Sequence, residues 1–134
     1  MRIPYVDFKV QLAHSRQDLL SAFENVLESG HFIQGPRSTE FEKMFAERVG
    51  ASLATGVSNG TCSLRLIFEA MGASPDHEVI TAPNSFFASA ASIDRSGARI
   101  RFADVGPDGN LSASEVQKVV ASNTLAIMPV HLAG

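Results

Sequence analysis

Residues 78–103 read EVITAPNSFFASAASIDRSGARIRFA. Two short apolar runs, Glu78–Ala82 and Arg99–Ala103, predict strands, and Phe86–Arg95 between them predicts a helix. Two strands that are joined by a helical crossover run parallel to each other. This stretch therefore predicts one strand–helix–strand unit of an α/β fold.

The same alternation continues on both sides of this unit. Leu53–Val57 predicts a strand and Thr61–Met71 a helix; Ser112–Ala121 predicts a helix and Leu125–Val130 a fourth strand. Parallel strands need helices on both faces, so we expect a three-layer α/β/α sandwich with a mostly parallel sheet. The final strand ends with the chain and no helix follows to cover it, which favours an incomplete domain. No linker interrupts residues 1–134, so we expect a single domain.

Two more helices are predicted ahead of the α/β alternation. After an extended start through Phe8, the segment Leu12–Glu28 carries apolar residues at the spacing of one helix face. A second helix is predicted at about Thr39–Val49. The residues of this helix that we expect to turn inward are Phe41, Met44 and Phe45.

Composition excludes several classes of protein. The 134 residues include 11 basic and 14 acidic ones, scattered along the chain, so there is no basic surface for nucleic acid. No apolar run is long enough to span a membrane, and the first residues lack the apolar stretch of a secretory signal. The only cysteine, Cys62, forms no disulfide within the chain and gives no metal-ligand spacing, which suits the cytoplasm. As a side chain, it fits a small apolar filler better than a nucleophile.

The turn from Ser58 to Thr61 lies between a predicted strand and a predicted helix. A helix N-terminus offers unpaired N–H groups and the positive end of its dipole, where a phosphate fits. Gly60 would let the backbone approach the anion, Thr61 adds a hydroxyl, and Ser58 or Asn59 could cap the helix. These four residues suit a phosphate site and an unliganded capped turn equally well.

Other candidate residues follow the next strands at the same edge of the sheet, where open α/β folds bind ligands. Within Pro83–Ala90, Phe86 or Phe87 could stack on a flat ring, although both are also ordinary core residues. Asp104 and His131 could line the same pocket, although a lone histidine at a strand end is more often structural.

Several motifs along the chain occur in a specific order and spacing. They are Gly35 and Pro36 followed by Phe41 and Glu42, SNGTCSL (58–64), EVITAPNSFFASA (78–90), FADV (102–105) and AIMPVHLAG (126–134). Together they resemble the N-terminal third of the DegT/DnrJ/StrS family of sugar aminotransferases, over nearly the whole chain.

The resemblance implies a fold-type I scaffold that binds pyridoxal 5′-phosphate (PLP). Many members of the family aminate a nucleotide-linked keto sugar, with glutamate as the usual amino donor. The resemblance implies that Gly60 and Thr61, with Asn59 beside them, bind the cofactor phosphate and that Phe86 stacks on the pyridine ring. It also implies a homodimer, in which residues 31–36 could contribute to the partner's site.

The resemblance further implies that no catalytic residue lies in this chain. Transamination needs a Schiff-base lysine and a carboxylate beside the pyridine nitrogen, and in the family both lie downstream of VHLAG. The lysines here are Lys9, on the extended start, and Lys43 and Lys118, on two predicted helices. We therefore expect the chain alone to be inactive.

Three alternatives differ in testable ways. A PLP-dependent sugar dehydratase would keep the scaffold and replace the lysine by a histidine. A non-catalytic binding or dimerisation module would carry no cofactor. A Rossmann-type nucleotide binder is disfavoured because SNGT, and not G-x-G-x-x-G, follows the first sheet strand. The sequence leaves the sugar and the aminated position open.

Overall fold

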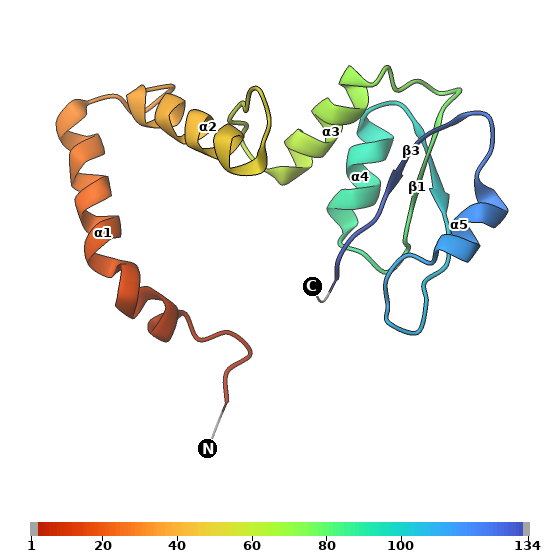
Figure 1. Ribbon diagram of the computed structural model, residues 1–134, viewed down its shortest axis with the longest axis horizontal. Coiled ribbons are helices and arrows are strands. Elements are labelled where there is room, and N and C mark those ends of the chain that lie inside the picture. The colour runs from red at the N-terminus through yellow and green to blue at the C-terminus, as the bar shows by residue number, and fades with distance from the viewer. Residues whose placement is uncertain (1–2, 133–134) are drawn as a thin grey trace. The chain divides into compact units, whose positions relative to one another are not determined.

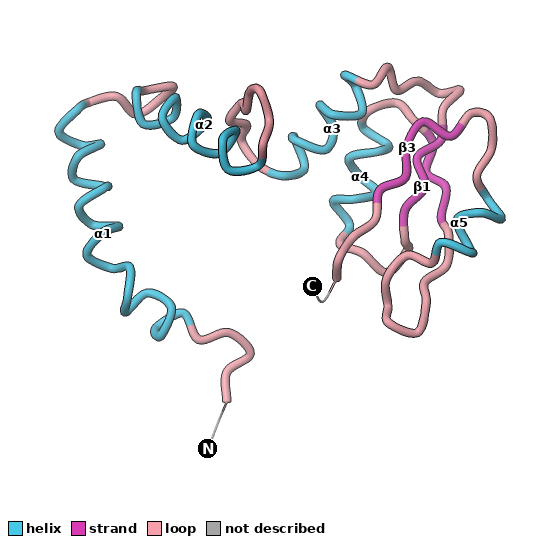
Figure 2. Tube along the Cα trace, in the orientation of Figure 1, coloured by secondary structure: helices cyan, strands magenta, loops and turns pink. Residues whose placement is uncertain are grey.

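The computed structural model describes residues 3–132, apart from the side chain of Gln11. The chain divides into two compact units, the first up to Gly56 and the second from Val57 onward, and each is described by itself. Figure 1 labels the elements, and Figure 2 distinguishes helices, strands and loops by colour. In the described residues, the first unit is helical and the second is α/β.

The first unit contains α1 (Phe8–Ser29) and α2 (Pro36–Val49), so both predicted helices are confirmed. α1 begins earlier than the apolar spacing indicated. The Asp7 carboxylate accepts hydrogen bonds from the backbone N–H groups of Lys9 (3.0 Å) and Val10 (3.3 Å) and caps the helix there. Within the described residues, the non-helical start therefore ends at Asp7, and Lys9 lies on a helix.

The prediction that α2 turns three large apolar residues inward is wrong for this chain. Phe41 and Met44 are each 61% exposed and Phe45 is 49% exposed, whereas Ala46 is buried. Within the described residues of the first unit, no further element covers this face. Phe41 and Phe45 pack on each other instead, with ring centroids 5.7 Å apart. Helical spacing identifies the apolar face, but burial needs a partner.

Gly35, the N-cap of α2, leaves less room for a Cβ than the other described glycines of this unit. A Cβ added at Gly35 would lie 2.7 Å from the Cβ of His31 and 3.0 Å from its carbonyl oxygen. We expect Gly35→Ala to lower the free energy of unfolding by about 1–3 kcal/mol, because backbone must shift to make room. Urea denaturation measures this loss. Gly60→Ala is the control, since a Cβ there meets nothing within 4 Å; equal losses in the two variants would contradict the explanation.

The strand predicted at Leu53–Val57 is wrong. This segment is irregular, and Leu53 is 86% exposed. A strand requires a ladder of backbone hydrogen bonds to a neighbour, and no described strand pairs with these residues. The N–H of Gly56 instead donates to the carboxylate of Glu42 on α2, at 2.6 Å.

The second unit is built on a three-stranded parallel sheet. It contains β1 (Glu78–Thr81), β2 (Arg99–Phe102) and β3 (Thr124–Met128), in the order β2-β1-β3. Val79 in the central strand lies opposite Ile100 on one side and Ala126 on the other. Three of the four predicted strands are therefore confirmed, each within one or two residues of its predicted bounds.

Helices cover both faces of this sheet. They are α3 (Gly60–Ala70), α4 (Phe87–Arg95) and α5 (Ala113–Val119), as predicted (Figure 1). Val79 packs with Phe68 of α3 and Ile93 of α4, whereas the next residue, Ile80, packs with Val116 of α5. Successive strand residues point to opposite faces, so β1 supplies both cores. The second unit has the predicted three-layer α/β/α architecture.

No helix within the described part of the chain is long and apolar enough to cross a membrane.

Candidate functional site

The turn at the start of α3 is held by its own side chains. The amide oxygen of Asn59 accepts a hydrogen bond from the backbone N–H of Cys62 at 2.9 Å, so Asn59 is the N-cap. Its amide nitrogen donates to the Ser58 hydroxyl at 3.3 Å. The Ser58 hydroxyl in turn donates to the sulfur of Cys62 at 3.2 Å. The sequence allowed Ser58 or Asn59 as the cap, and the structure selects Asn59.

Gly60 and Thr61 are the first two residues of α3. The N–H groups of such residues have no partner inside their own helix. A Cβ added at Gly60 would meet nothing within 4 Å, so the space above its backbone is open. Thr61 is half-buried beside it. An anion could therefore approach this helix end closely, next to a hydroxyl.

Phe86 is the N-cap residue of α4 and is 77% exposed. Phe87 is equally exposed, so the alternative that both rings are core residues is wrong for this chain. The two rings lie in different places. Phe86 lines a cavity next to α3, whereas Phe87 lines a separate groove with Arg95 and Ile100.

The cavity beside Phe86 brings the turn of α3 and the ring together. Its volume is approximately 460 Å³, within the range of small-molecule sites. The residues that line it are Gly60, Thr61, Ser63 and Leu64 from α3, Phe86 at the N-cap of α4, and Ala88 and Ser89 from the first turn of α4. Three of the four predicted cofactor residues thus share one cavity, and Asn59 holds the turn at its edge. The arrangement suits a flat ring that carries an anionic group.

A family model for the DegT/DnrJ/EryC1/StrS aminotransferases matches residues 14–134. The chain belongs to this aminotransferase family. The family motif at the end of the chain, AIMPVHLAG, includes Ala133 and Gly134, which lie outside the described residues.

Relatives of known structure or activity support the same assignment. The chain is 35% identical over 128 residues to dTDP-3-amino-3,4,6-trideoxy-alpha-D-glucose transaminase of Micromonospora megalomicea subsp. nigra, covering 95% of this chain and 34% of the relative. It is similar to DesV of S. venezuelae in complex with a ketimine intermediate (TM-score 0.91, 31% identity, 99% of this chain and 36% of DesV). It is also similar to NtdA of Bacillus subtilis with bound PMP (TM-score 0.87, 27% identity, 98% of this chain and 31% of NtdA).

The chain spans about a third of the length of the curated relatives that it matches, for example 34% of the transaminase. Three of these relatives are named as aminotransferases or transaminases of nucleotide-linked sugars.

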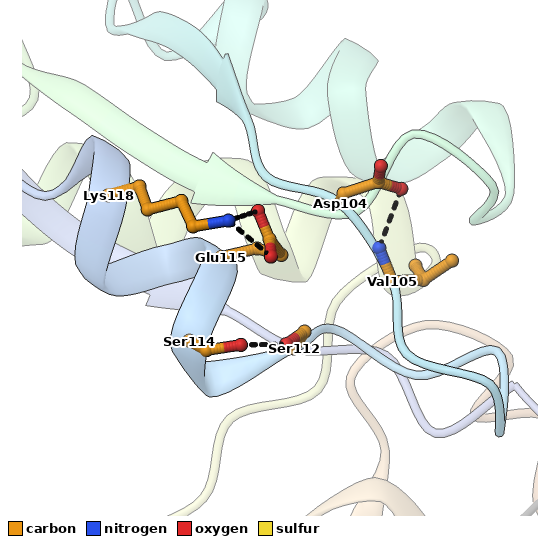
Figure 3. A network of polar contacts seen from close by, with 6 residues as sticks. All are labelled: Asp104, Val105, Ser112, Ser114, Glu115 and Lys118. Atoms are coloured by element: carbon orange, nitrogen blue, oxygen red, sulfur yellow. Dashed lines mark hydrogen bonds and ion pairs between the residues drawn. The ribbon is translucent and has the colours of Figure 1, made fainter.

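Two other predicted pocket residues do not line the cavity. The Asp104 carboxylate accepts a hydrogen bond from the N–H of the next residue, Val105, at 2.8 Å (Figure 3). Its backbone carbonyl accepts one from the N–H of Ser112 at 3.1 Å. His131 is exposed beyond the end of β3. Asp104 therefore shapes the loop that follows β2.

None of the three lysines lines the cavity. The Nζ atom of Lys118 donates to both carboxylate oxygens of Glu115, at 2.7 and 2.8 Å, along α5 (Figure 3). Lys9 and Lys43 lie on the helices of the first unit. The prediction that the Schiff-base lysine must come from residues beyond this chain therefore still stands as a prediction.

Asn59 offers a direct test of the turn. We expect Asn59→Ala to lower the free energy of unfolding by about 1 kcal/mol, because the Cys62 N–H loses its acceptor. Asn59→Asp keeps an oxygen in the same place and should retain most of this stability. Thermal or urea denaturation measures both, and an equal loss in Asn59→Asp would show that Asn59 does not act as a cap.

The structure also reveals a contact that the sequence did not indicate. The amide nitrogen of Asn84 donates to the backbone carbonyl of Gly109 at 2.9 Å. The two residues lie on separate loops, 25 positions apart in the sequence. No sequence motif links them. Only the course of the chain brings them together.

Proposed function

We propose that this chain is the N-terminal part of the large domain of a PLP-dependent aminotransferase. The whole enzyme would transfer an amino group from glutamate to a keto sugar linked to a nucleotide. The observation that supports this most directly is the cavity in which Gly60, Thr61 and Phe86 meet. The dTDP-sugar transaminase from M. megalomicea and the PMP-bound NtdA, to which the chain is similar, support the substrate and cofactor classes.

The residues present fit PLP at both of its ends. The open space over Gly60 and the N–H groups of the first turn of α3 suit the phosphate, and the Thr61 hydroxyl adds a donor. The exposed ring of Phe86 offers a face for the pyridine ring. When bound, PLP supplies an electron sink that stabilises negative charge next to the amino group.

Each residue has a distinct part in this arrangement. Asn59 holds the first turn of α3 in place through its bond to Cys62, so that the phosphate donors are preorganised. Gly60 leaves the approach open, and Thr61 would donate to the phosphate. Phe86 would cover one face of the cofactor ring and keep water away from that face. A Schiff-base lysine and a carboxylate for the pyridine nitrogen would come from the rest of the protein.

An isotope-transfer assay on the full-length protein tests this proposal. The protein is incubated with PLP, ¹⁵N-glutamate and keto sugars linked to dTDP or UDP, and the products are identified by mass spectrometry. We expect ¹⁵N in the sugar and an equal amount of 2-oxoglutarate. The 134-residue chain, assayed beside it, should give neither product.

Other results of this assay would contradict the proposal. A dehydrated sugar without nitrogen would indicate a dehydratase. A full-length protein that binds no PLP, as judged by its visible absorbance, would favour a non-catalytic binding or dimerisation module.

We also propose that the enzyme is a cytoplasmic homodimer. The exposed apolar residues of α1 would suit contact with another polypeptide surface; among them are Leu19, Leu20, Phe23 and Leu27. Cys62 is a free thiol, which suits a reducing compartment. Light scattering on the full-length protein measures the oligomeric state, and a monomer would contradict the dimer.

A further inference from the structure

Asn84 connects two loops at the carboxyl end of the sheet in the second unit. It lies between the end of β1 and Phe86, and its amide nitrogen donates to the carbonyl of Gly109 at 2.9 Å. Gly109 belongs to the loop between β2 and α5. In Figure 1 both loops lie at the end of the sheet where β1 and β2 finish.

The loop Gly106–Asn110 holds its own shape and presents the Gly109 carbonyl as a fixed acceptor. The Gly109 N–H donates to the Gly106 carbonyl, and the Gly106 N–H to the Asn110 carbonyl, each at 2.9 Å. Gly109 takes a left-handed backbone (φ 76°), which suits glycine. The Asn110 backbone and side-chain N–H groups both donate to Asp108, at 3.1 Å, and these bonds lower the pKa of that carboxyl group.

The turn that carries Phe86 has fewer restraints of its own. The Ser85 hydroxyl donates to the Ala82 carbonyl at 3.2 Å, and the Ser89 N–H donates to the Phe86 carbonyl at 2.9 Å. The side chain of Phe86 makes no capping bond, and its ring is mostly exposed. Contacts of the ring with the described residues therefore do little to determine where it lies. The bond from Asn84 reaches this turn from a separate, preorganised loop.

We infer that Asn84 is a positioning residue for Phe86. Its hydrogen bond to Gly109 holds the turn so that the Phe86 ring stays at the edge of the cavity, ready to meet a flat cofactor ring. This inference rests on the proposed binding of PLP. It makes the loop Gly106–Asn110, which does not line the cavity, a determinant of cofactor affinity.

Two variants of the full-length protein test the inference. Asn84→Ala removes the side chain, and Asn84→Asp keeps its shape but has no donor for the Gly109 carbonyl. The dissociation constant of PLP is measured by absorbance titration, and the exchange rate of the Ser89 amide is measured in the apo protein by NMR or mass spectrometry. We expect PLP to bind about fivefold more weakly and the Ser89 amide to exchange about fivefold faster in both variants, as befits one lost hydrogen bond.

A matched control lies at the other end of the sheet. The amide nitrogen of Asn123 donates to the carbonyl of Asp76 at 3.2 Å, again between two loops and again exposed. Asn123→Ala should cost similar stability but leave PLP affinity and Ser89 exchange unchanged.

Unchanged PLP affinity in both Asn84 variants would overturn the inference, and so would equal effects in Asn123→Ala. Failure of the unaltered protein to bind PLP would instead overturn the proposed function. In that case the Ser89 exchange rate alone decides whether Asn84 holds the Phe86 turn.

Discussion

Gly60→Asp is expected to weaken PLP binding about 100-fold and to leave the apo protein as stable as before, or slightly more stable. A carboxylate on the first residue of α3 would lie where the cofactor phosphate is proposed to bind, and it would repel that anion. The same carboxylate interacts favourably with the helix dipole in the absence of PLP, by about 0.3–1 kcal/mol. Absorbance titration gives the affinity, and thermal denaturation gives the apo stability.

Ala113→Asp is the matched control for this prediction. Ala113 is the first residue of α5, so the variant adds the same charge at the same position of another helix on the opposite face of the sheet. It should bind PLP like the unaltered protein. Normal PLP affinity in Gly60→Asp would show that the phosphate does not bind at the start of α3.

Ile93→Ala is expected to lower the free energy of unfolding by about 2–5 kcal/mol. Ile93 is completely buried, at 0% exposure, and packs with Phe68, Val79 and Ala98 between α4 and the sheet. Truncation to alanine removes apolar contacts and leaves a cavity that close-packed neighbours fill only in part. Urea denaturation of the full-length protein measures the loss.

The neighbouring residue provides the control. Asp94 is exposed, and its charge lies near the negative end of the α4 dipole, so Asp94→Ala should be neutral or slightly stabilising. A loss below about 1 kcal/mol in Ile93→Ala would mean that this face of the sheet is not a close-packed core.

Much of the candidate site could be predicted from local sequence. Asn59, Gly60 and Thr61 form a recognisable helix start, and the apolar runs around Phe86 indicated a strand followed by a helix. These features depend on residues that are close together in the chain. The structure confirms the elements and places Gly60, Thr61 and Phe86 around one cavity.

The wrong predictions are those in which a residue pattern was read correctly but the segment that would pair with it or cover it is not among the described residues. Leu53–Val57 has the composition of a strand, but no described strand pairs with it and Glu42 binds the N–H of Gly56 instead. Phe41 and Met44 have helical spacing, but no described element of their unit covers them. A strand ladder and a buried face both require a second surface, which a local pattern cannot specify.

The sequence by itself determined the order of helices and strands in the second unit, the helix start at residues 58–61 and the family resemblance, because each depends on short-range spacing and residue type. Only the tertiary structure decided that Val79 and Ile80 pack into separate cores on opposite faces of the sheet. It also decided that the Asn84 amide donates a hydrogen bond to the Gly109 carbonyl. The shared cavity of α3 and α4 was decided in the same way. These contacts join residues that are distant in the chain, and they follow from how the parallel sheet brings separate loops to one edge.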